Sequence, residues 1–195
     1  DCPVYRDYAE AISESRPELV FVCTPNRYSP DISVYAIEHG CHVFCEKPPG
    51  RNLEDIRRIV AAEKGYPGVK VMFGFNHRHH PAITEAKSII DAERMGRLLW
   101  VRGVYGKSGG EGFEKSWRND PGQSGGGILI DQGIHMLDLF RFFCGDFVEC
   151  QGMVDTCYWD LPVEDNAFVM LRAKDGQVAQ LHSTATLWKH TFRLD

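Results

Sequence analysis

Three apolar runs of strand length alternate with two helical segments in the first half of the chain. No other sequence feature constrains the fold as strongly. The runs are residues 19–23, 41–45 and 69–73, and each ends in a polar turn. Between them, Ile32, Tyr35 and Ala36 mark the apolar side of one helix, and residues 53–60 carry the spacing of another. Alternating strands and helices predict an open parallel sheet of the α/β class.

Polar side chains follow each of these predicted strands. Asn26 follows the first strand, Lys47 the second and Asn76 the third. Because right-handed crossovers keep neighbouring strands parallel, the three strand ends share one edge of the sheet. Open parallel sheets bind their ligands at that edge, so Lys47 is the first candidate for chemistry. The competing interpretation is a solvated lysine after a strand, but the two prolines that follow Lys47 favour a functional position.

The periodicity changes after Gly96, where strand patterns become dominant. Residues 98–105, 147–155, 166–172, 178–186 and 191–194 predict strands, and Lys174-Asp175-Gly176-Gln177 predicts a hairpin turn. We therefore expect residues 96–195 to form an α+β domain with a mostly antiparallel open sheet, and residues 1–95 to form the parallel domain. An uncovered sheet face with unfinished edges predicts a homo-oligomer that assembles through this sheet.

One helix, over residues 128–143, interrupts these strands and carries the second set of candidates. Asp131, His135 and Asp138 stand at positions i, i+4 and i+7 and therefore share one stripe of the helix. A neutral imidazole with an unperturbed pKa of about 6.5 can take a hydroxyl proton at neutral pH, so His135 is the candidate acid/base. The alternatives are a histidine without a catalytic role and an Asp131 that only pairs with it. Asp138 is expected to be structural.

Three more patterns have competing interpretations. The long polar loop over residues 106–122 is of a length that is commonly functional. The glycines at 125–127 resemble a phosphate cradle, but no suitable strand precedes them, which favours close backbone packing. His77, His79 and His80 are possible zinc ligands, but no third ligand type accompanies them, so we expect a surface turn and no metal site. A metal-dependent hydrolase is the corresponding alternative function.

Charge and cysteine content argue against several function classes. The net charge is -5 and no basic stripe occurs, which argues against binding to nucleic acid. No run of about 18 apolar residues and no recognisable leader sequence occur, so we expect no association with a membrane. The seven cysteines are scattered and form no CxxC pair, which favours reduced thiols and a cytoplasmic location.

Five motifs taken together resemble those of the Gfo/Idh/MocA family, which includes glucose-fructose oxidoreductases and inositol dehydrogenases. They are Thr24-Pro25-Asn26, Glu46-Lys47-Pro48, Phe75-Asn76, Trp117-Arg118 with the following glycine run, and Asp131-Gln132-Gly133-Ile134-His135. Their order and spacing cover most of residues 5–195. The resemblance implies a partial Rossmann-type domain that binds NAD(P), followed by a substrate domain. Because the family's GxGxxG turn does not occur, we expect the chain to lack the N-terminal part of the first domain and the end of the second.

The resemblance also implies an NAD(P)-dependent oxidoreductase that transfers a hydride between a nicotinamide and a secondary alcohol. The implied substrate is a sugar, polyol, inositol or nucleotide sugar. Lys47 would lie beside the nicotinamide and the reacting hydroxyl, His135 would exchange the proton, and Asp131 would hold the sugar. The residues expected to bind cofactor are Thr24, Pro25, Asn26, Glu46, Lys47, Asn76, Trp117 and Arg118. The choice between NAD and NADP stays open, because the residue that decides it belongs to the GxGxxG unit.

Two other functions remain compatible with the same fold. One is a non-catalytic regulator that binds NAD(H), although a pure binder does not need Lys47, Asp131 and His135 together. The other is an inert chain, since the absence of the glycine turn removes the pyrophosphate site at a helix N-terminus.

Overall fold

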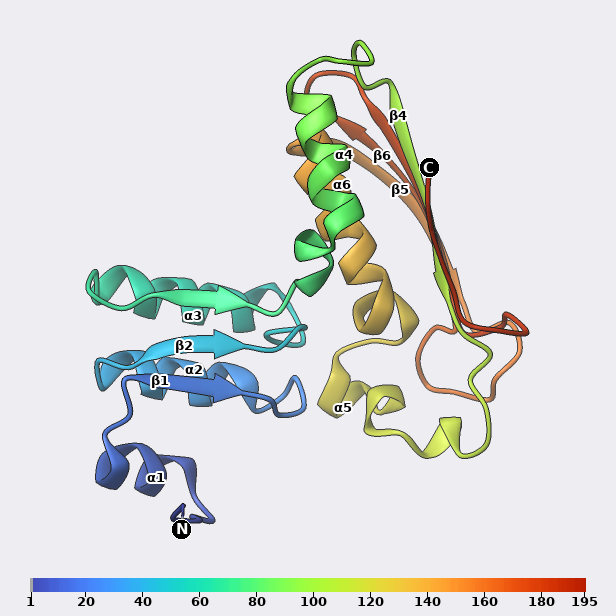
Figure 1. The fold of residues 1–195 in the computed structure, drawn as a ribbon. Coiled ribbons are helices and arrows are strands. Elements are labelled where there is room, and N and C mark those ends of the chain that lie inside the picture. The colour runs from blue at the N-terminus through green and yellow to red at the C-terminus, as the bar shows by residue number, and fades with distance from the viewer. Residues whose placement is uncertain (1) are drawn as a thin grey trace. The chain divides into compact units, whose positions relative to one another are not determined.

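The computed structural model describes residues 2–195, which pack as two compact units. The first unit extends to Gly74 and includes Gly122–Gly125, and the second consists of Phe75–Pro121 and Gly126–Asp195 (Figure 1). Helix α4 (Pro81–Asp91) therefore packs in the second unit, where its Ile83 joins the hydrophobic core. The division into domains at residues 95 and 96 stays a prediction.

The first unit contains the predicted parallel sheet. Strands β1 (Leu19–Val22), β2 (His42–Cys45) and β3 (Val71–Phe73) lie in the order β1-β2-β3, and both pairings are parallel. Its helices are α1 (Tyr8–Ser15), α2 (Ser29–Glu38) and α3 (Leu53–Gly65). This arrangement confirms the α/β alternation expected from the sequence.

Helices α2 and α3 help bury one side of this sheet. Ile37 and Ile59 of these helices join Val43 in the core, and all three are almost fully buried. Asn52 caps α3, since its side chain accepts a hydrogen bond from the Asp55 amide at 3.0 Å. Phe21 stays 63% exposed, so apolar side chains also face outward from this unit.

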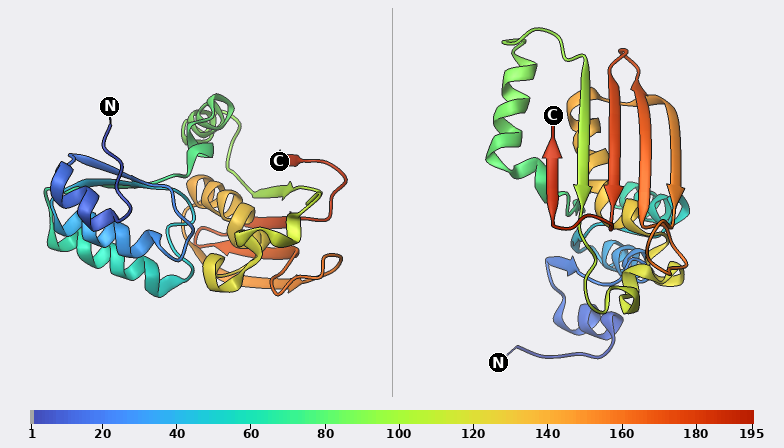
Figure 2. Two further views of the ribbon diagram at one scale, coloured as in Figure 1. Left: turned by 90° about the horizontal axis from the view of Figure 1, so that it is seen from below. Right: turned by 90° about the vertical axis from the view of Figure 1, so that its right-hand side faces the viewer.

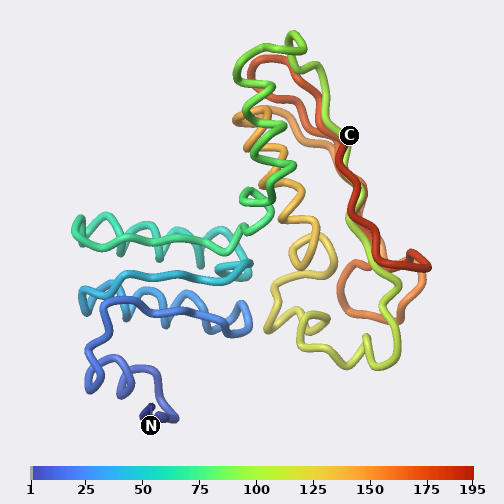
Figure 3. The backbone as a smooth tube through the Cα atoms, viewed as in Figure 1, coloured from blue at the N-terminus to red at the C-terminus, as the bar shows by residue number. Residues whose placement is uncertain are grey.

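The second unit is built around a five-stranded sheet. Its strands are β4 (Trp100–Gly106), β5 (Phe147–Asp155), β6 (Asn166–Ala173), β7 (Val178–Thr184) and β8 (Thr191–Leu194). The short helical turns of this part of the chain are η1 (Asn76–His79) before α4 and, between β4 and α6, η2 (Phe113–Lys115), η3 (Trp117–Asn119), α5 (Pro121–Ser124) and the π-helical turn η4 (Leu129–Gly133) (Figure 3). Residues 122–124 of α5 belong to the first unit. Helix α6 (Ile134–Cys144) continues directly from η4 and completes the predicted helix over residues 128–143.

The strand order β5-β6-β7-β4-β8 makes the sheet mixed (Figure 2). Three of its four pairings are antiparallel, as predicted, but β4 pairs with β7 in parallel, with Val101 opposite Ala179. The reason is topological, because the chain crosses over through α6, β5 and β6 before it returns beside β4. The predicted hairpin turn at residues 174–177 does connect the antiparallel pair β6 and β7.

Helix α6 packs against the inner face of this sheet. Met136, Leu139 and Phe140 have no exposed surface and form the core with apolar side chains of the strands. Gly103 of β4 permits the close approach, because a Cβ there would collide with the Met136 side chain. In the right-hand view of Figure 2, the sheet faces the viewer and α6 lies behind it.

The outer face of the sheet carries exposed apolar side chains: Trp100, Met153, Phe168 and Met170. Phe168 stacks on His182 with ring centroids 4.3 Å apart. Burial lowers the pKa of the His182 imidazole. Among residues 2–195, no helix has the length and apolar character needed to cross a bilayer.

Asp165 organises the connection between β5 and β6. Its carboxylate has no exposed surface and accepts hydrogen bonds from the backbone amides of Cys157, Tyr158 and Trp159 at 2.7 to 2.9 Å. Burial by itself would raise the pKa of this carboxyl, but these amides and the Asn166 side chain lower it overall. One buried anion therefore holds the loop over residues 156–165 in place.

The Asp165→Asn variant is expected to lower the free energy of unfolding by about 2 to 3 kcal/mol, because an amide cannot replace a carboxylate that accepts several charge-assisted hydrogen bonds. Urea denaturation measures the loss. Asp160→Asn is the control, since Asp160 is exposed in the same loop, and it should leave the midpoint unchanged. Equal stability of the two variants would contradict the role given to Asp165.

His182 should make stability depend on pH. Its folded pKa lies below the unfolded value of about 6.5, so the unfolded state binds more protons in that window and stability falls as the pH falls below about 6.5. His182→Gln should show a smaller decrease in melting temperature between pH 7.5 and pH 5 than the unmodified chain. His190→Gln, at an exposed position, should keep the full decrease.

Candidate active site

His135 lies in the first turn of α6 and is only 6% exposed. Its imidazole stacks on that of His77, with ring centroids 4.1 Å apart and an interplanar angle of 15°. The edge of the Phe75 ring approaches it with centroids 6.0 Å apart, and Tyr105 lies at 6.2 Å. The predicted acid/base is therefore held by aromatic packing within the second unit.

Asp131 lies in η4, just before α6, and is paired with two cations. Its Oδ2 accepts a hydrogen bond from Lys107 Nζ at 2.9 Å, and its Oδ1 lies 3.2 Å from Arg118 Nε. The Asp131 side chain is 14% exposed. Asp131 is thus a charged hydrogen-bond acceptor, which suits contact with sugar hydroxyl groups.

The predicted pair Trp117 and Arg118 belongs to the same cluster. Both residues lie in η3, and the Arg118 guanidinium carbon stands 4.5 Å from the centroid of the Trp117 ring. This cation–π contact and the ion pair with Asp131 fix the guanidinium from two sides. Their predicted role in cofactor binding stays a prediction.

Asp138 has the structural role expected for it. It accepts two hydrogen bonds from Arg78, from Nε at 2.7 Å and from Nη2 at 2.5 Å. The hydrogen bond to Asp138 raises the pKa of the Arg78 guanidinium further above its ordinary value. This bidentate pair connects η1 with α6 and therefore helps to position His77 against His135.

The glycine run at 125–127 is a packing element rather than a phosphate cradle. The amides of Gly127 and Leu129 donate to the two carboxylate oxygens of Glu164, at 2.8 and 3.0 Å. A Cβ at Gly127 would also collide with the Glu164 backbone. Glu164 thus places its own negative charge at the beginning of the helix, where an anion is favourable. These contacts support the interpretation that the glycines allow close backbone packing.

In the first unit, Glu46 and Lys47 follow β2 directly. The Glu46 carboxylate accepts the Lys47 amide at 3.3 Å and lies against Gly74, where a Cβ would come within 2.9 Å of its Oε2. Lys47 is half-buried and its peptide bond to Pro48 is cis. Pro48 and Pro49 are buried, so the lysine is held in a packed turn and does not extend from a free tail.

The Thr24-Pro25-Asn26 turn follows β1 and contacts residues far along the chain. Asn26 is 3% exposed, and its side-chain amide donates to the Ser124 carbonyl at 2.7 Å. The Thr24 and Ser29 hydroxyls are 3.2 Å apart, which closes the turn locally. Asn26 therefore has a structural contact, whereas cofactor binding by this turn stays a prediction.

The histidine turn differs in part from the prediction. Only His79 and His80 are exposed, and the side chain of His80 caps α4 by accepting the Ala82 amide at 3.2 Å. His77 is half-buried against His135, so a description of all three as surface residues is wrong for His77. Asn76 begins η1 and is exposed. Within residues 2–195, no group of three His, Cys, Asp or Glu side chains could hold a metal ion.

Lys107 and Tyr105 were not identified from the sequence. Lys107 follows β4 at the start of the long polar loop, and no local pattern distinguished it from the other lysines. The Tyr105 ring lies close to the imidazoles of His77 and His135, and its centroid is 5.5 and 6.2 Å from theirs. Burial, and to a smaller extent the charge of Asp131, raises the pKa of the Tyr105 phenol. The only signal in the sequence that pointed to Lys107 was the unusual length of the polar loop over residues 106–122, in which it lies.

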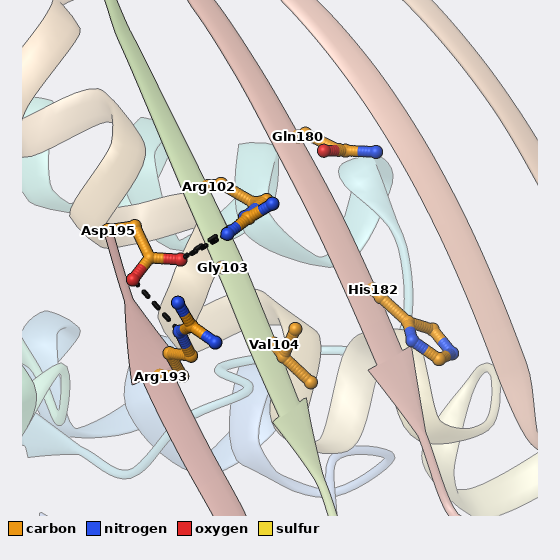
Figure 4. A pocket seen from close by; sticks show the side chains of 7 residues that line it. All are labelled: Arg102, Gly103, Val104, Gln180, His182, Arg193 and Asp195. Carbon is orange, nitrogen blue, oxygen red and sulfur yellow. Dashed lines mark hydrogen bonds and ion pairs between the residues drawn. The ribbon is translucent and has the colours of Figure 1, made fainter.

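A separate hollow lies on the outer face of the sheet, over β4, β7 and β8 (Figure 4). Asp195 accepts hydrogen bonds there from Arg102 at 2.9 Å and from Arg193 at 2.9 Å. Asp195 thus offsets one of the two positive charges that Arg102 and Arg193 bring to this hollow. The hollow contains none of the predicted site residues.

Comparisons with known proteins identify the family of this chain. The GFO/IDH/MocA C-terminal domain matches residues 83–195, and the oxidoreductase family with an NAD-binding Rossmann fold matches residues 1–75. Levoglucosan dehydrogenase of Pseudarthrobacter phenanthrenivorans is 28% identical over 91% of this chain and 52% of its own length. The 1,5-anhydro-D-fructose reductase of Ensifer adhaerens is 30% identical, again over 91% of this chain and 53% of its own length.

Solved structures give the same result. A levoglucosan dehydrogenase in complex with NADH superposes with a TM-score of 0.91 at 27% identity, over 97% of this chain and 54% of that one. The chain thus spans about half the length of the curated relatives it matches. From the two family matches, we conclude that the chain belongs to the GFO/IDH/MocA family of oxidoreductases, whose N-terminal domain is an NAD-binding Rossmann fold.

Proposed function

We propose that this chain carries the substrate-binding residues and part of the cofactor-binding residues of an NAD(H)-dependent oxidoreductase. The reaction would oxidise a secondary alcohol of a sugar or polyol, or reduce the corresponding ketone. The observation that carries the proposal is the Asp131 carboxylate, which is held by Lys107 and Arg118 one turn before the buried His135. A charged acceptor for hydroxyl groups beside an imidazole suits binding and deprotonation of a polyol.

The residues after β1 and β2 fit the nicotinamide half of a cofactor. Thr24, Glu46 and Lys47 offer a hydroxyl, a carboxylate and an ammonium, which are suitable partners for ribose hydroxyls and a carboxamide. When bound, the nicotinamide supplies the hydride acceptor. Lys47 would stabilise negative charge that develops on the substrate oxygen, and His135 would take the hydroxyl proton. Asn76, Trp117 and Arg118 are proposed to complete the contacts.

The relatives support the substrate class and the cofactor. The names of levoglucosan dehydrogenase and 1,5-anhydro-D-fructose reductase describe redox reactions of sugars. The levoglucosan dehydrogenase structure contains NADH, which favours NAD(H) for this chain also. Residues 1–95 would then be the cofactor domain and residues 96–195 the substrate domain. A regulator without activity is less well supported, because a pure binder does not need Lys47, Asp131 and His135 together.

We also propose a homo-oligomer that forms through the outer face of the five-stranded sheet. Trp100, Met153, Phe168 and Met170 give this face an apolar surface of the kind that subunit interfaces bury. A cytoplasmic location is proposed as well, because all seven cysteines are free thiols and Cys41, Cys45 and Cys144 are buried. Burial raises the pKa of the Cys45 thiol to about 11, which keeps it unreactive at neutral pH.

A titration with NADH tests the proposed cofactor. It would use this chain and a longer form that supplies a strand and a GxGxxG turn before residue 1. We expect nicotinamide fluorescence to report saturable binding by the longer form and at least tenfold weaker binding by this chain, since the pyrophosphate site belongs to the glycine turn. Absence of binding by both forms would overturn the oxidoreductase assignment.

Replacement of the proposed acid/base tests the chemistry. In the form that oxidises a sugar alcohol, His135→Asn should lower kcat by about 10²- to 10⁴-fold, because no other group replaces the proton acceptor. The dissociation constant for NADH should change less than twofold. His79→Asn is the matched control from the exposed part of the histidine turn and should keep full activity. Full activity of the His135 variant would refute its catalytic role.

A further inference from the structure

The orientation of the His135 imidazole is not fixed by its own helix. The torsion that turns a histidine ring, χ2, has broad and nearly equivalent minima, so the backbone of α6 places the Cβ of His135 but leaves the ring plane free. A proton acceptor works only when one of its ring nitrogens points at the reacting hydroxyl group. Side chains that pack against the ring must therefore supply its orientation.

His77 covers one face of this ring. The centroids of the two imidazoles lie 4.1 Å apart, and the ring planes differ by 15°. The Phe75 ring approaches His135 edge-on, with centroids 6.0 Å apart and an angle of 86°. The face contact and the edge contact together restrict rotation about χ2, because a turn of the His135 ring would drive its edge into His77.

His77 is itself held by packing and by its own backbone. The Phe192 ring of β8 meets it at an angle of 88° with centroids 5.0 Å apart, and the Tyr105 ring of β4 lies 5.5 Å away. The backbone around His77 forms the short helical turn η1, in which the amide of His80 donates to the His77 carbonyl at 3.1 Å. Two strands and a closed turn therefore support the stacked ring.

An ion pair ties this turn to the helix that carries His135. Arg78, next to His77 in η1, donates two hydrogen bonds to the Asp138 carboxylate, at 2.7 and 2.5 Å. Asp138 follows His135 by three positions in α6, so both side chains lie on one face of that helix. The anchor of the turn and the imidazole that the turn covers therefore belong to one helix.

The stacked arrangement does not pass a proton directly between the two imidazoles. The N–H bond and the lone pair of an imidazole lie in the plane of its ring. In two nearly parallel rings that face each other these groups point past the neighbouring ring, so no hydrogen bond joins the pair. What His77 offers to His135 is a flat face.

We propose that His77 is a positioning residue for the acid/base His135, whose ring plane it holds in the orientation that proton transfer requires. A planar side chain at position 77 then preserves the reaction, whereas a side chain of similar size without a flat face does not. This inference rests on the proposed function and adds to it a residue of the histidine turn.

His77→Phe and His77→Leu form a matched pair of variants. Both remove the ring nitrogens and keep an apolar side chain, but only phenylalanine keeps a flat face. In the longer form that oxidises a sugar alcohol, His77→Phe should keep kcat within about threefold, whereas His77→Leu should lower it about 10- to 100-fold, because the proton acceptor is misoriented. KM and the dissociation constant for NADH should stay within about twofold, since neither depends on proton transfer. His79→Leu, exposed in the same turn, is the control and should keep full activity.

The His135 ring can also be followed in this chain without turnover. With ¹³C-labelled histidine, relaxation of the Cδ2–Hδ2 group gives the order parameter of each imidazole, and His135→Asn identifies the His135 signal by its absence. We expect an order parameter of about 0.8 for His135 in the unmodified chain and in His77→Phe, and a value below about 0.6 in His77→Leu. The measurement is made on the folded chain, so it reports ring motion rather than stability.

The proposal is overturned if the His135 ring stays equally ordered in His77→Leu, or if His77→Phe loses as much activity as His77→Leu. The second result would assign the ring nitrogens of His77, and not its face, to the reaction. Failure of the proposed function is distinguishable, because the unmodified longer form would then neither bind NADH nor oxidise an alcohol, while the order parameters would still test the stack.

Discussion

The carboxylate of Glu164 fixes the beginning of the helix that carries the acid/base candidates. It accepts the amides of Gly127 and Leu129, while the Glu164 backbone carbonyl accepts the amide of Ile128 at 3.0 Å. The first backbone amides at a helix N-terminus have no acceptor within the helix, so they need acceptors from elsewhere. An anion at this end also interacts favourably with the helix dipole. Asp131 and His135 follow within the next turns, so their positions depend on this contact. The protein itself fills the position that a bound anion takes in other glycine-rich turns.

Much of the fold could be predicted because its signals are local. The apolar run at residues 41–45 became β2, and the hairpin turn at 174–177 correctly joined β6 to β7. The parallel pairing of β4 with β7 could not be predicted, because spacing within a strand does not determine its neighbour. The role of Glu164 was also hidden, since it contacts an amide 37 positions away.

The candidate site shows the same limit. Asp131 and His135 were identified from their spacing and from the family motifs, whereas Lys107 was identified only through its contact with Asp131. His77 was considered from the sequence only as a possible zinc ligand, and the structure shows that it stacks on His135. A lysine or histidine in a polar loop has no distinguishing neighbours in sequence. Its environment depends on which distant segments fold against it. In addition, η4 is a π-helical turn, so the positions of its side chains differ from those that regular α-helical spacing predicts.

The first unit is discontinuous in sequence, and this has a consequence for how the chain folds. Asn26 binds the carbonyl of Ser124, which is 98 positions away, and Arg27 and Arg51 bind the carbonyls of Gln123 and Gly122. On the ribosome, the N-terminal segment therefore emerges long before the residues that complete its packing, and closing so long a loop costs entropy. The packing of the first unit is therefore complete only after the segment Gly122–Gly125 has been synthesised.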